Sequence, residues 1–221
     1  MSKPSTIAID GPVASGKSTV GRRLAQRLGY RFVDTGAMYR ALTVEAVRVG
    51  IDLEDEAALA RLAQDTAIDI ESSEGNRAIV NGRDVTAGLR SDAVERGVSP
   101  VSKVAGVRTV LVKKQQAMAV GGGIVMAGRD IGTNVLTGAD LKIYLDVSVE
   151  EQARRRYNEL LALGEDVEYQ AILDNLIRRD RIDSSRSANP LRPADDAVRI
   201  DTDKMDEDGV VEYIIKLVNE R

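Results

Sequence analysis

Short apolar runs alternate along the chain with longer stretches in which apolar residues recur at every third or fourth position. The run Thr6-Ile7-Ala8-Ile9 is typical of a buried strand, and Val20, Leu24 and Leu28 after it predict an amphipathic helix that ends at Gly29. By the same pattern we expect further strands at 31–33, 124–127, 141–145 and 198–200, and helices at 36–49, 54–66, two between 149 and 183, and one after Asp206. This alternation favours an α/β fold with a parallel sheet between layers of helices and ligands at the carboxyl ends of the strands.

One segment, from about Ala67 to Ser99, follows a different pattern. Ile68 and Ile70 alternate with polar neighbours, a turn is expected at 74–76, and Asn81-Gly82 between two extended stretches is a strong hairpin signal. We therefore expect a small antiparallel insertion in the parallel scaffold. The alternative is an ordinary surface embellishment.

Two helices have local signals at their starts. One is expected to begin near Pro100, with Ser99 as its N-cap, and to present Val107 and Leu111 on its apolar face. For a later helix, Ser148 and Glu151 have the spacing of a capping box, in which each side chain bonds to the other residue's backbone amide.

Composition excludes several kinds of chemistry. The chain of 221 residues contains no cysteine and no histidine, which excludes disulfides, thiol chemistry, imidazole bases and histidine metal sites. Its net charge of −4 argues against broad binding to nucleic acid or to anionic membranes. The N-terminus leaves no room for a signal peptide, and the weakly polar run 117–128 is too short to span a bilayer, so we expect a cytoplasmic protein. Without histidine, phosphoryl transfer to an acceptor that is already negatively charged is the favoured chemistry.

The most specific motif is GPVASGKS at residues 11–18, which matches the phosphate-binding loop G-x-x-x-x-G-K-[ST] between a predicted strand and a predicted helix. Gly11 and Gly16 allow the backbone to curl so that its N–H groups face a phosphate at the N-terminus of the helix. Lys17 is expected to reach the β- and γ-phosphates, and the Ser18 hydroxyl to ligate Mg²⁺. The motif predicts binding of a nucleoside triphosphate.

Two further segments follow predicted strands. Asp34 to Arg40 places a hydroxyl and an arginine at the start of a helix, which suits an anionic acceptor; the alternative is a threonine N-cap with a solvated arginine. Gly128-Arg129-Asp130 ends a core strand, where Arg129 can face a phosphate; the alternative is a turn with a structural salt bridge.

Charged residues on helices are the third group of candidates. Arg179, Asp183 and Arg186 lie on one helical face if the helix extends that far, although a solvated, salt-bridged face has the same pattern. The same alternative applies to Arg154, Arg155 and Arg156. Arg108 lies within an apolar stripe, where a charge is costly, so we expect it to meet a ligand or a buried carboxylate.

The segments IDGPVASGKST, VDTGAMYRA, AGRDIGT and RRDRIDSSRSANPL occur in the order and spacing of the bacterial cytidylate kinase family, which the chain resembles over nearly its full length. The resemblance implies a P-loop nucleoside monophosphate kinase fold, as a single kinase domain. Its core is expected at 1–34, 100–150 and 190–221, its acceptor-binding lobe with the insert at 35–99, and its mobile lid at 151–189. The implied reaction transfers the γ-phosphoryl group of ATP to CMP or dCMP, with Mg²⁺, in a monomer that binds neither nucleic acid nor membrane.

The resemblance also assigns roles to residues. Lys17, Arg129 and Arg186 are implied to stabilise the transferring phosphoryl group, and Ser18 to hold the metal. The implied ATP phosphate site is formed by Gly11, Pro12, Val13, Ala14, Ser15, Gly16, Lys17, Ser18 and Thr19. For the acceptor, Thr35, Arg40, Arg129 and Arg186 are implied to bind the phosphate, Tyr39 to flank it, Ser99, Arg108 and Asp130 to read the cytosine edge, and Arg179 and Asp183 to hold the pentose. Ile182 and Ser184 stand where some members of the family carry charge.

Three alternatives remain open at this point. A shikimate-kinase-like enzyme shares the start of the sequence and a glycine run at 121–123, but the long insert and the Tyr39-Arg40 pair argue against it. A GTPase switch needs N-K-x-D to read guanine, and the nearest segment, 203–206, lacks the asparagine. A nucleotide-binding module without catalysis would bind ATP tightly and transfer no phosphoryl group.

Overall fold

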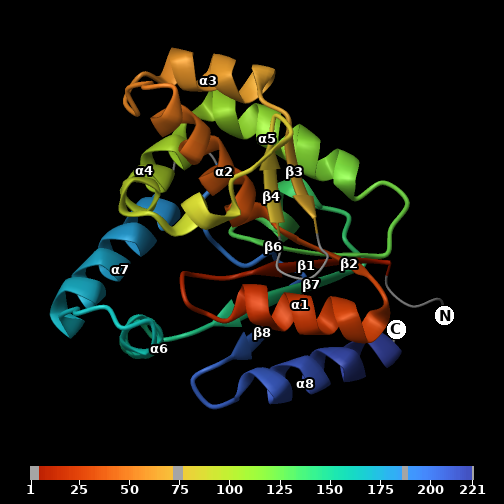
Figure 1. Ribbon diagram of the computed structural model, residues 1–221. Coiled ribbons are helices and arrows are strands. Elements are labelled where there is room, and N and C mark those ends of the chain that lie inside the picture. The colour runs from red at the N-terminus through yellow and green to blue at the C-terminus, as the bar shows by residue number, and fades with distance from the viewer. Residues whose placement is uncertain (1–4, 72–76, 186–188, 221) are drawn as a thin grey trace. The chain divides into compact units, whose positions relative to one another are not determined.

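The computed structural model describes residues 5–71, 77–185 and 189–220. The contacts within the chain divide it into two compact units, Met1–Tyr30 with Gly122–Arg221 and Arg31–Gly121. Figure 1 labels their helices and strands.

The first unit is built on parallel strands, as the sequence predicts. β1 (Thr6–Asp10) lies between β6 (Ile124–Gly128) and β7 (Leu141–Asp146), and β8 (Val198–Asp201) pairs with β7. The remaining predicted strand, β2 (Arg31–Asp34), belongs to the second unit, where it leads directly into its first helix. Every residue of β6 is buried, which explains why its sequence is a continuous apolar run.

Four helices and a short helical turn complete this unit: α1 (Lys17–Leu28), α6 (Val149–Ala162), α7 (Tyr169–Ser184), α8 (Glu207–Asn219) and the π-helical turn η2 (Ile131–Val135). As predicted, α1 ends at Gly29, whose left-handed backbone caps it. Figure 1 shows α8 beside α1, where Arg23 pairs with Asp208 and Arg27 with Glu212. These pairs are exposed, so apolar packing holds the two helices together.

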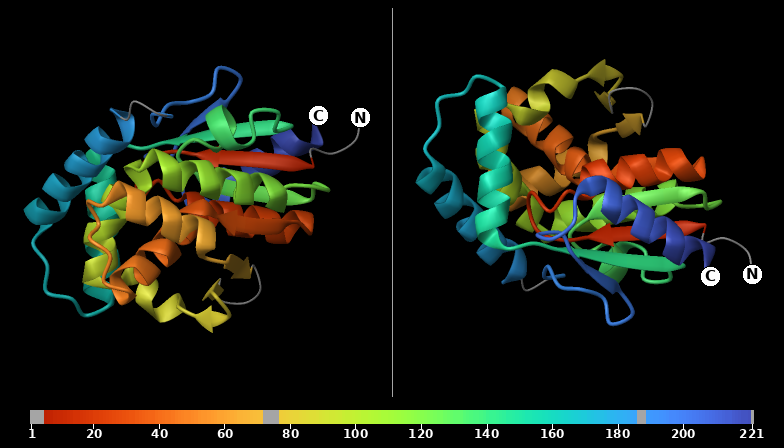
Figure 2. Two further views of the ribbon diagram at one scale, coloured as in Figure 1. Left: turned by 90° about the horizontal axis from the view of Figure 1, so that it is seen from above. Right: turned by 90° about the horizontal axis from the view of Figure 1, so that it is seen from below.

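The predicted capping box is only half formed. The Ser148 side chain accepts a hydrogen bond from the Glu151 backbone amide and caps α6. The reciprocal bond does not form, because the Ser148 backbone amide donates to the Asp203 carboxylate over 3.0 Å and the Glu151 carboxylate accepts hydrogen bonds from Arg154 and Arg155. Figure 2 shows α6 packed against α7 and the loop that joins them.

The second unit contains α2 (Thr35–Arg48), α3 (Glu56–Asp65), α4 (Asp92–Lys103) and α5 (Ala105–Met118), with the 3₁₀ turn η1 (Thr86–Arg90). Asp34 and Asp55 cap α2 and α3 through their carboxylates. The predicted hairpin is confirmed: β3 (Ile68–Glu71), β4 (Arg77–Val80) and β5 (Arg83–Asp84) form an antiparallel sheet, with Asn81 and Gly82 both at positive φ between β4 and β5. The turn expected at 74–76 lies outside the described residues.

Two predictions for this unit are wrong. The antiparallel segment ends at Asp84 rather than near Ser99, and the helix expected to begin near Pro100 is two helices that meet at Val104. The first of them, α4, continues through Pro100 because Val94, Val98 and Val101 form a buried face that outweighs the cost of the proline. Ser99 therefore lies inside a helix and is not an N-cap.

Hydropathy gives no sign of a membrane segment in the described ranges. None of the helices in 5–71, 77–185 or 189–220 has the length and apolar character needed to cross a bilayer.

The contact between α3 and α5 yields a prediction about packing. A Cβ added to Gly106 would lie 2.6 Å from the Cβ of Ala60, an atom that cannot move without its helix. We expect Gly106→Ala to lower the free energy of unfolding by about 1–3 kcal/mol, as over-packing does, despite alanine's better helix propensity. The measurement is urea unfolding, with Gly138→Ala as the control because a Cβ there meets nothing within 4 Å. A Gly106→Ala protein as stable as the control would contradict the tight α3–α5 contact.

Candidate active site

The phosphate loop, residues 11–18, connects the carboxyl end of β1 to α1 as the sequence predicts. Gly11 has φ 154°, and a Cβ there would lie 2.4 Å from the carbonyl oxygen of Leu145 at the end of β7. Gly16 adopts the left-handed conformation directly before α1. Only glycine fits both positions, which gives the motif its two glycines.

Lys17 is buried inside this loop. Its ammonium group donates hydrogen bonds to the carbonyl of Pro12 and, over 3.1 Å, to the hydroxyl of Ser15. Within the described residues no side chain caps the N-terminus of α1, and its first turn has no acidic residue. A buried ammonium group beside an uncapped helix N-terminus is an arrangement that favours a phosphate.

Asp10, the last residue of β1, is a site residue that sequence reasoning missed. Its carboxylate is 3% exposed and accepts hydrogen bonds from the backbone amides of Ile131 and Gly132, each over 2.7 Å. Burial raises the pKa of Asp10 from 3.8 to about 6, against the opposing effects of these two amides and of Lys17; the nearby Asp130 raises it further. The signal that could have found it is a charge at the end of an apolar run, directly before the phosphate loop.

The turn after β6 brings three candidates together. The Arg129 Nε donates to Asp183 over 2.9 Å, and another nitrogen of its guanidinium donates to the Gly11 carbonyl over 3.3 Å. Asp183 lies in α7 and is buried, and Asp130 accepts a hydrogen bond from Asn134. The salt bridge that was the alternative interpretation for Arg129 therefore exists. Arg129 forms it with Asp183, which is itself a predicted site residue.

One turn before Asp183 on α7, Asp180 is a half-buried carboxylate near the phosphate loop. It accepts a hydrogen bond from Gln152 of α6 over 3.1 Å. Burial raises its pKa, while Gln152, the Arg129 charge and the Val13 amide lower it. Arg179 precedes it on the same helix, and Arg186 lies outside the described residues.

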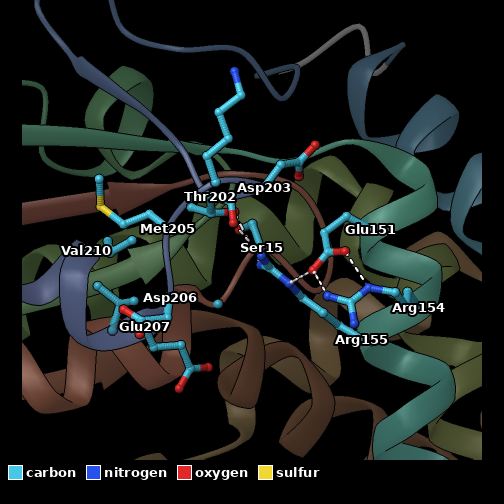
Figure 3. Close-up of a pocket in the computed structure, with 13 residues that line it drawn as sticks. Ser15, Glu151, Arg154, Arg155, Thr202, Asp203, Met205, Asp206, Glu207 and Val210 are labelled. Atoms are coloured by element: carbon cyan, nitrogen blue, oxygen red, sulfur yellow. Dashed lines mark hydrogen bonds and ion pairs between the residues drawn. The ribbon is translucent and has the colours of Figure 1, made fainter.

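Figure 3 shows a pocket of about 420 Å³ beside the phosphate loop. It is lined by Ser15, Gly16 and Val20, by Glu151, Arg154 and Arg155 of α6, and by residues 202–207 and Val210. Arg155 points across it, donating to Glu151 over 2.7 Å and to the Thr202 hydroxyl over 3.2 Å. In the sequence, residues 203–206 resemble a guanine-binding motif that lacks its asparagine, which gives no indication of this pocket. The better signal was their position after the last strand, at the carboxyl edge of the sheet.

In the second unit, the start of α2 holds three predicted residues. Thr35 is buried in the first turn, and the Arg40 Nε lies 3.6 Å from a carboxylate oxygen of Glu95 in α4. Arg40 also lies close over Gly36, whose added Cβ would be 3.1 Å from its guanidinium. The structure thus holds Arg40 at the N-terminus of α2, between Gly36 and Glu95.

Arg108 of α5 is 4% exposed and faces Tyr39. Its guanidinium lies 5.9 Å from the centre of the Tyr39 ring and donates to the Tyr39 hydroxyl and to the Ser102 carbonyl, each over 3.4 Å. Ser99 lies one turn before Ser102, whose hydroxyl bonds to its carbonyl. Thus Tyr39 and Arg108, far apart in the sequence, form one polar cluster in an apolar setting.

Comparison with known proteins gives consistent results. The family model described as cytidylate kinase matches residues 7–220. The cytidylate kinase of Geobacillus kaustophilus is 51% identical over 222 residues, covering 100% of this chain and 99% of that protein, and that of Bacillus subtilis is 46% identical over 222 residues with the same coverage.

Solved structures with similar folds are much more distant in sequence. A gluconokinase from Sinorhizobium meliloti has a TM-score of 0.53 and 14% identity, covering 100% of this chain and 94% of that one. A shikimate kinase from Bacteroides thetaiotaomicron has a TM-score of 0.51 and 13% identity, with 97% and 98% covered. These two likenesses concern the fold alone.

The buried Asp10 predicts a pH dependence of stability. Because its pKa is higher in the folded than in the unfolded protein, folding favours the protonated form, and this stabilisation is complete below about pH 4 and lost as the pH rises through 6. Relative to Asp10→Asn, we expect the free energy of unfolding of the wild type to fall by on the order of 3 kcal/mol over that range. Urea unfolding at a series of pH values measures it.

Asp140 provides the opposite case as a control. Hydrogen bonds from Thr6 and Ser5 lower the pKa of its carboxyl, the Thr6 hydroxyl having the largest effect. The wild type should therefore gain stability relative to Asp140→Asn as the pH rises through the acid range. If the stability of the wild type relative to Asp10→Asn and relative to Asp140→Asn changes with pH in the same direction, the raised pKa of Asp10 is wrong.

Proposed function

The chain belongs to the cytidylate kinase family, and from this we propose that it transfers the γ-phosphoryl group of ATP to CMP or dCMP, giving ADP and CDP or dCDP. The observation that carries the proposal is identity of 46–51% along essentially the full length of cytidylate kinases. A phosphate loop alone would not suffice, because many kinases share it. The shikimate-kinase-like alternative is not favoured.

On the donor side, residues 11–19 bind the triphosphate, and Lys17 exchanges its bonds within the loop for the β- and γ-phosphates. The pocket beside Ser15 and Arg155 accepts the nucleoside end of ATP, since it adjoins the loop. No group of three acidic, histidine or cysteine residues that could bind a metal occurs in the described parts of the chain. Ser18 follows Lys17 in the motif, and its hydroxyl would hold Mg²⁺ together with phosphate oxygens and water. When bound, Mg²⁺ neutralises charge on the phosphates.

On the acceptor side, the proposed roles follow the family motifs. Thr35, Arg40, Arg129 and Arg186 bind the CMP phosphate and Tyr39 flanks it; Ser99, Arg108 and Asp130 bind the cytosine edge; Arg179 and Asp183 bind the pentose. The burial of Arg108 and Asp130 supports their role in binding the cytosine edge. A base that leaves such buried polar groups without a hydrogen-bond partner binds much more weakly than one that pairs with them.

The mechanism requires no general base. The attacking oxygen belongs to a phosphate that is already an anion, in agreement with a sequence without histidine. Catalysis then consists of alignment and neutralisation, by Lys17 and by arginines such as Arg129. Arg129 donates to Asp183 through its Nε, and we propose that other N–H groups of the same guanidinium bind the phosphate while Asp183 binds the pentose.

The remaining expectations are part of the same proposal. Residues 151–189 act as a lid that excludes water, because hydrolysis of ATP is the competing reaction. Residues 35–99 form the acceptor lobe, and 1–34, 100–150 and 190–221 the core. The enzyme acts as a cytoplasmic monomer on free nucleotides, without nucleic acid or membrane.

The test is ADP release with ATP and Mg²⁺, comparing CMP, dCMP, UMP, AMP, GMP and shikimate as acceptors. We expect CMP and dCMP to be preferred, and Lys17→Ala to lower kcat by about 10²-fold or more, the effect of losing one electrostatic donor. Preference for shikimate, or tight ATP binding without transfer to any acceptor, would reject the proposal. A folded Lys17→Ala enzyme with normal kcat would reject the role of Lys17.

Base recognition by Arg108 gives a separate prediction. We expect Arg108→Met to lower kcat/KM for CMP by roughly 10²-fold while the KM for ATP stays within about twofold, because the lost contacts, to the cytosine, Tyr39 and Ser102, all lie on the acceptor side. Arg77→Met, which removes an exposed pair with Asp84 in the hairpin, is the matched control. Equal losses for ATP and CMP would assign Arg108 a structural role.

A further inference from the structure

Asp10 holds the turn that follows β6. In the parallel pair of β1 and β6, Asp10 lies opposite Gly128, so both chains leave the sheet at this level. One goes into the phosphate loop and the other into Arg129 and Asp130. The two oxygens of the Asp10 carboxylate each accept one backbone amide, from Ile131 and from Gly132, over 2.7 Å.

Resting on the proposed function, we infer that Asp10 is a positioning residue, which fixes Arg129 and Asp130 relative to the phosphate loop for recognition of CMP. Arg129 and Asp130 immediately precede the two amides that Asp10 binds, so the carboxylate sets the point from which both side chains start. Arg129 is held from the other side by the Gly11 carbonyl, the residue after Asp10.

A carboxylate is the group that this arrangement requires. Two N–H donors converge on two oxygens, whereas an asparagine offers one oxygen and would turn its own N–H groups toward the second amide. Gly132 itself faces the carboxylate, since a Cβ there would lie 3.4 Å from an Asp10 oxygen and 3.1 Å from the Lys142 side chain.

The burial of Asp10 distinguishes it from a simple attachment point. At the opposite end of β1, Asp140 also accepts two backbone amides, of Ser5 and Thr6, over 3.0 and 2.9 Å, but it is exposed. Asp10 makes the same kind of contact at 3% exposure, where a charge is costly. The free-energy cost of burying this carboxylate is explained if the turn beside the phosphate loop must be held within a fraction of an ångström.

The experiment measures selectivity, which a loss of stability alone would not change. The readouts are kcat, the KM for CMP and for ATP, and the ratio of kcat/KM for CMP to that for UMP. We expect Asp10→Ala to lower the CMP-to-UMP ratio roughly tenfold and to raise the KM for CMP more than that for ATP, because a small misplacement costs orders of magnitude. Asp140→Ala is the matched control, with the ratio unchanged.

Two further variants keep the test decisive if Asp10→Ala does not fold. Asp10→Asn preserves volume and one acceptor, and Asp10→Glu keeps a carboxylate but displaces its oxygens by one methylene, so that the two amides cannot both be bound at their present positions. Both should lower the ratio in the same direction. Folded variants whose ratio stays within about twofold of the wild type would overturn the inference. A wild type that does not phosphorylate CMP would instead overturn the proposed function.

Discussion

The phosphate loop can exist only because Gly11 passes against the carbonyl of Leu145 at a distance that no side chain allows. This contact ties the loop to the end of β7, the strand beside β1. From there the backbone turns around the Lys17 ammonium group and enters α1 with an uncapped N-terminus. Each later feature of the donor site, including the pocket beside Ser15, starts from the position of this loop.

Carboxylates hold the arginines of the candidate site in place. Arg155 bonds to Glu151, Arg129 to Asp183, and Arg40 lies near Glu95. These pairs orient long side chains that would otherwise lose conformational entropy when they bind a ligand. They also place positive groups at defined positions in a chain whose net charge is −4.

The sequence predicts well those features that local physics determines. The strands, the phosphate loop, the end of α1 at Gly29 and the Asn81-Gly82 turn follow from periodicity and from backbone conformations that few residues adopt. The errors arise where distant residues compete with a local signal. Burial of one face carries α4 through Pro100, and two arginines draw Glu151 away from the capping box.

The same reason explains which site residues could not be found from the sequence. The two amides bound by Asp10 lie about 120 residues away in the chain, and Thr202, which contacts Arg155, is likewise remote from it. The two amides belong to the segment AGRDIGT and Thr202 to no motif, but in both cases only the fold identifies the contact. The pair of Tyr39 and Arg108 was partly foreseen, because a charge within an apolar stripe requires a partner, but only the fold identifies the tyrosine.

The position of Arg129 has a thermodynamic consequence. Its guanidinium is shared between the Gly11 carbonyl of the phosphate loop and Asp183 of α7. If nucleotide binding breaks these contacts, the first nucleotide to bind supplies the free energy that breaking them requires. A second nucleotide that binds afterwards does not have to supply it. The two substrates would then help each other to bind, and by linkage the factor by which ATP strengthens CMP binding must equal the factor by which CMP strengthens ATP binding. A single ion pair thereby favours the ternary complex over either half-filled enzyme.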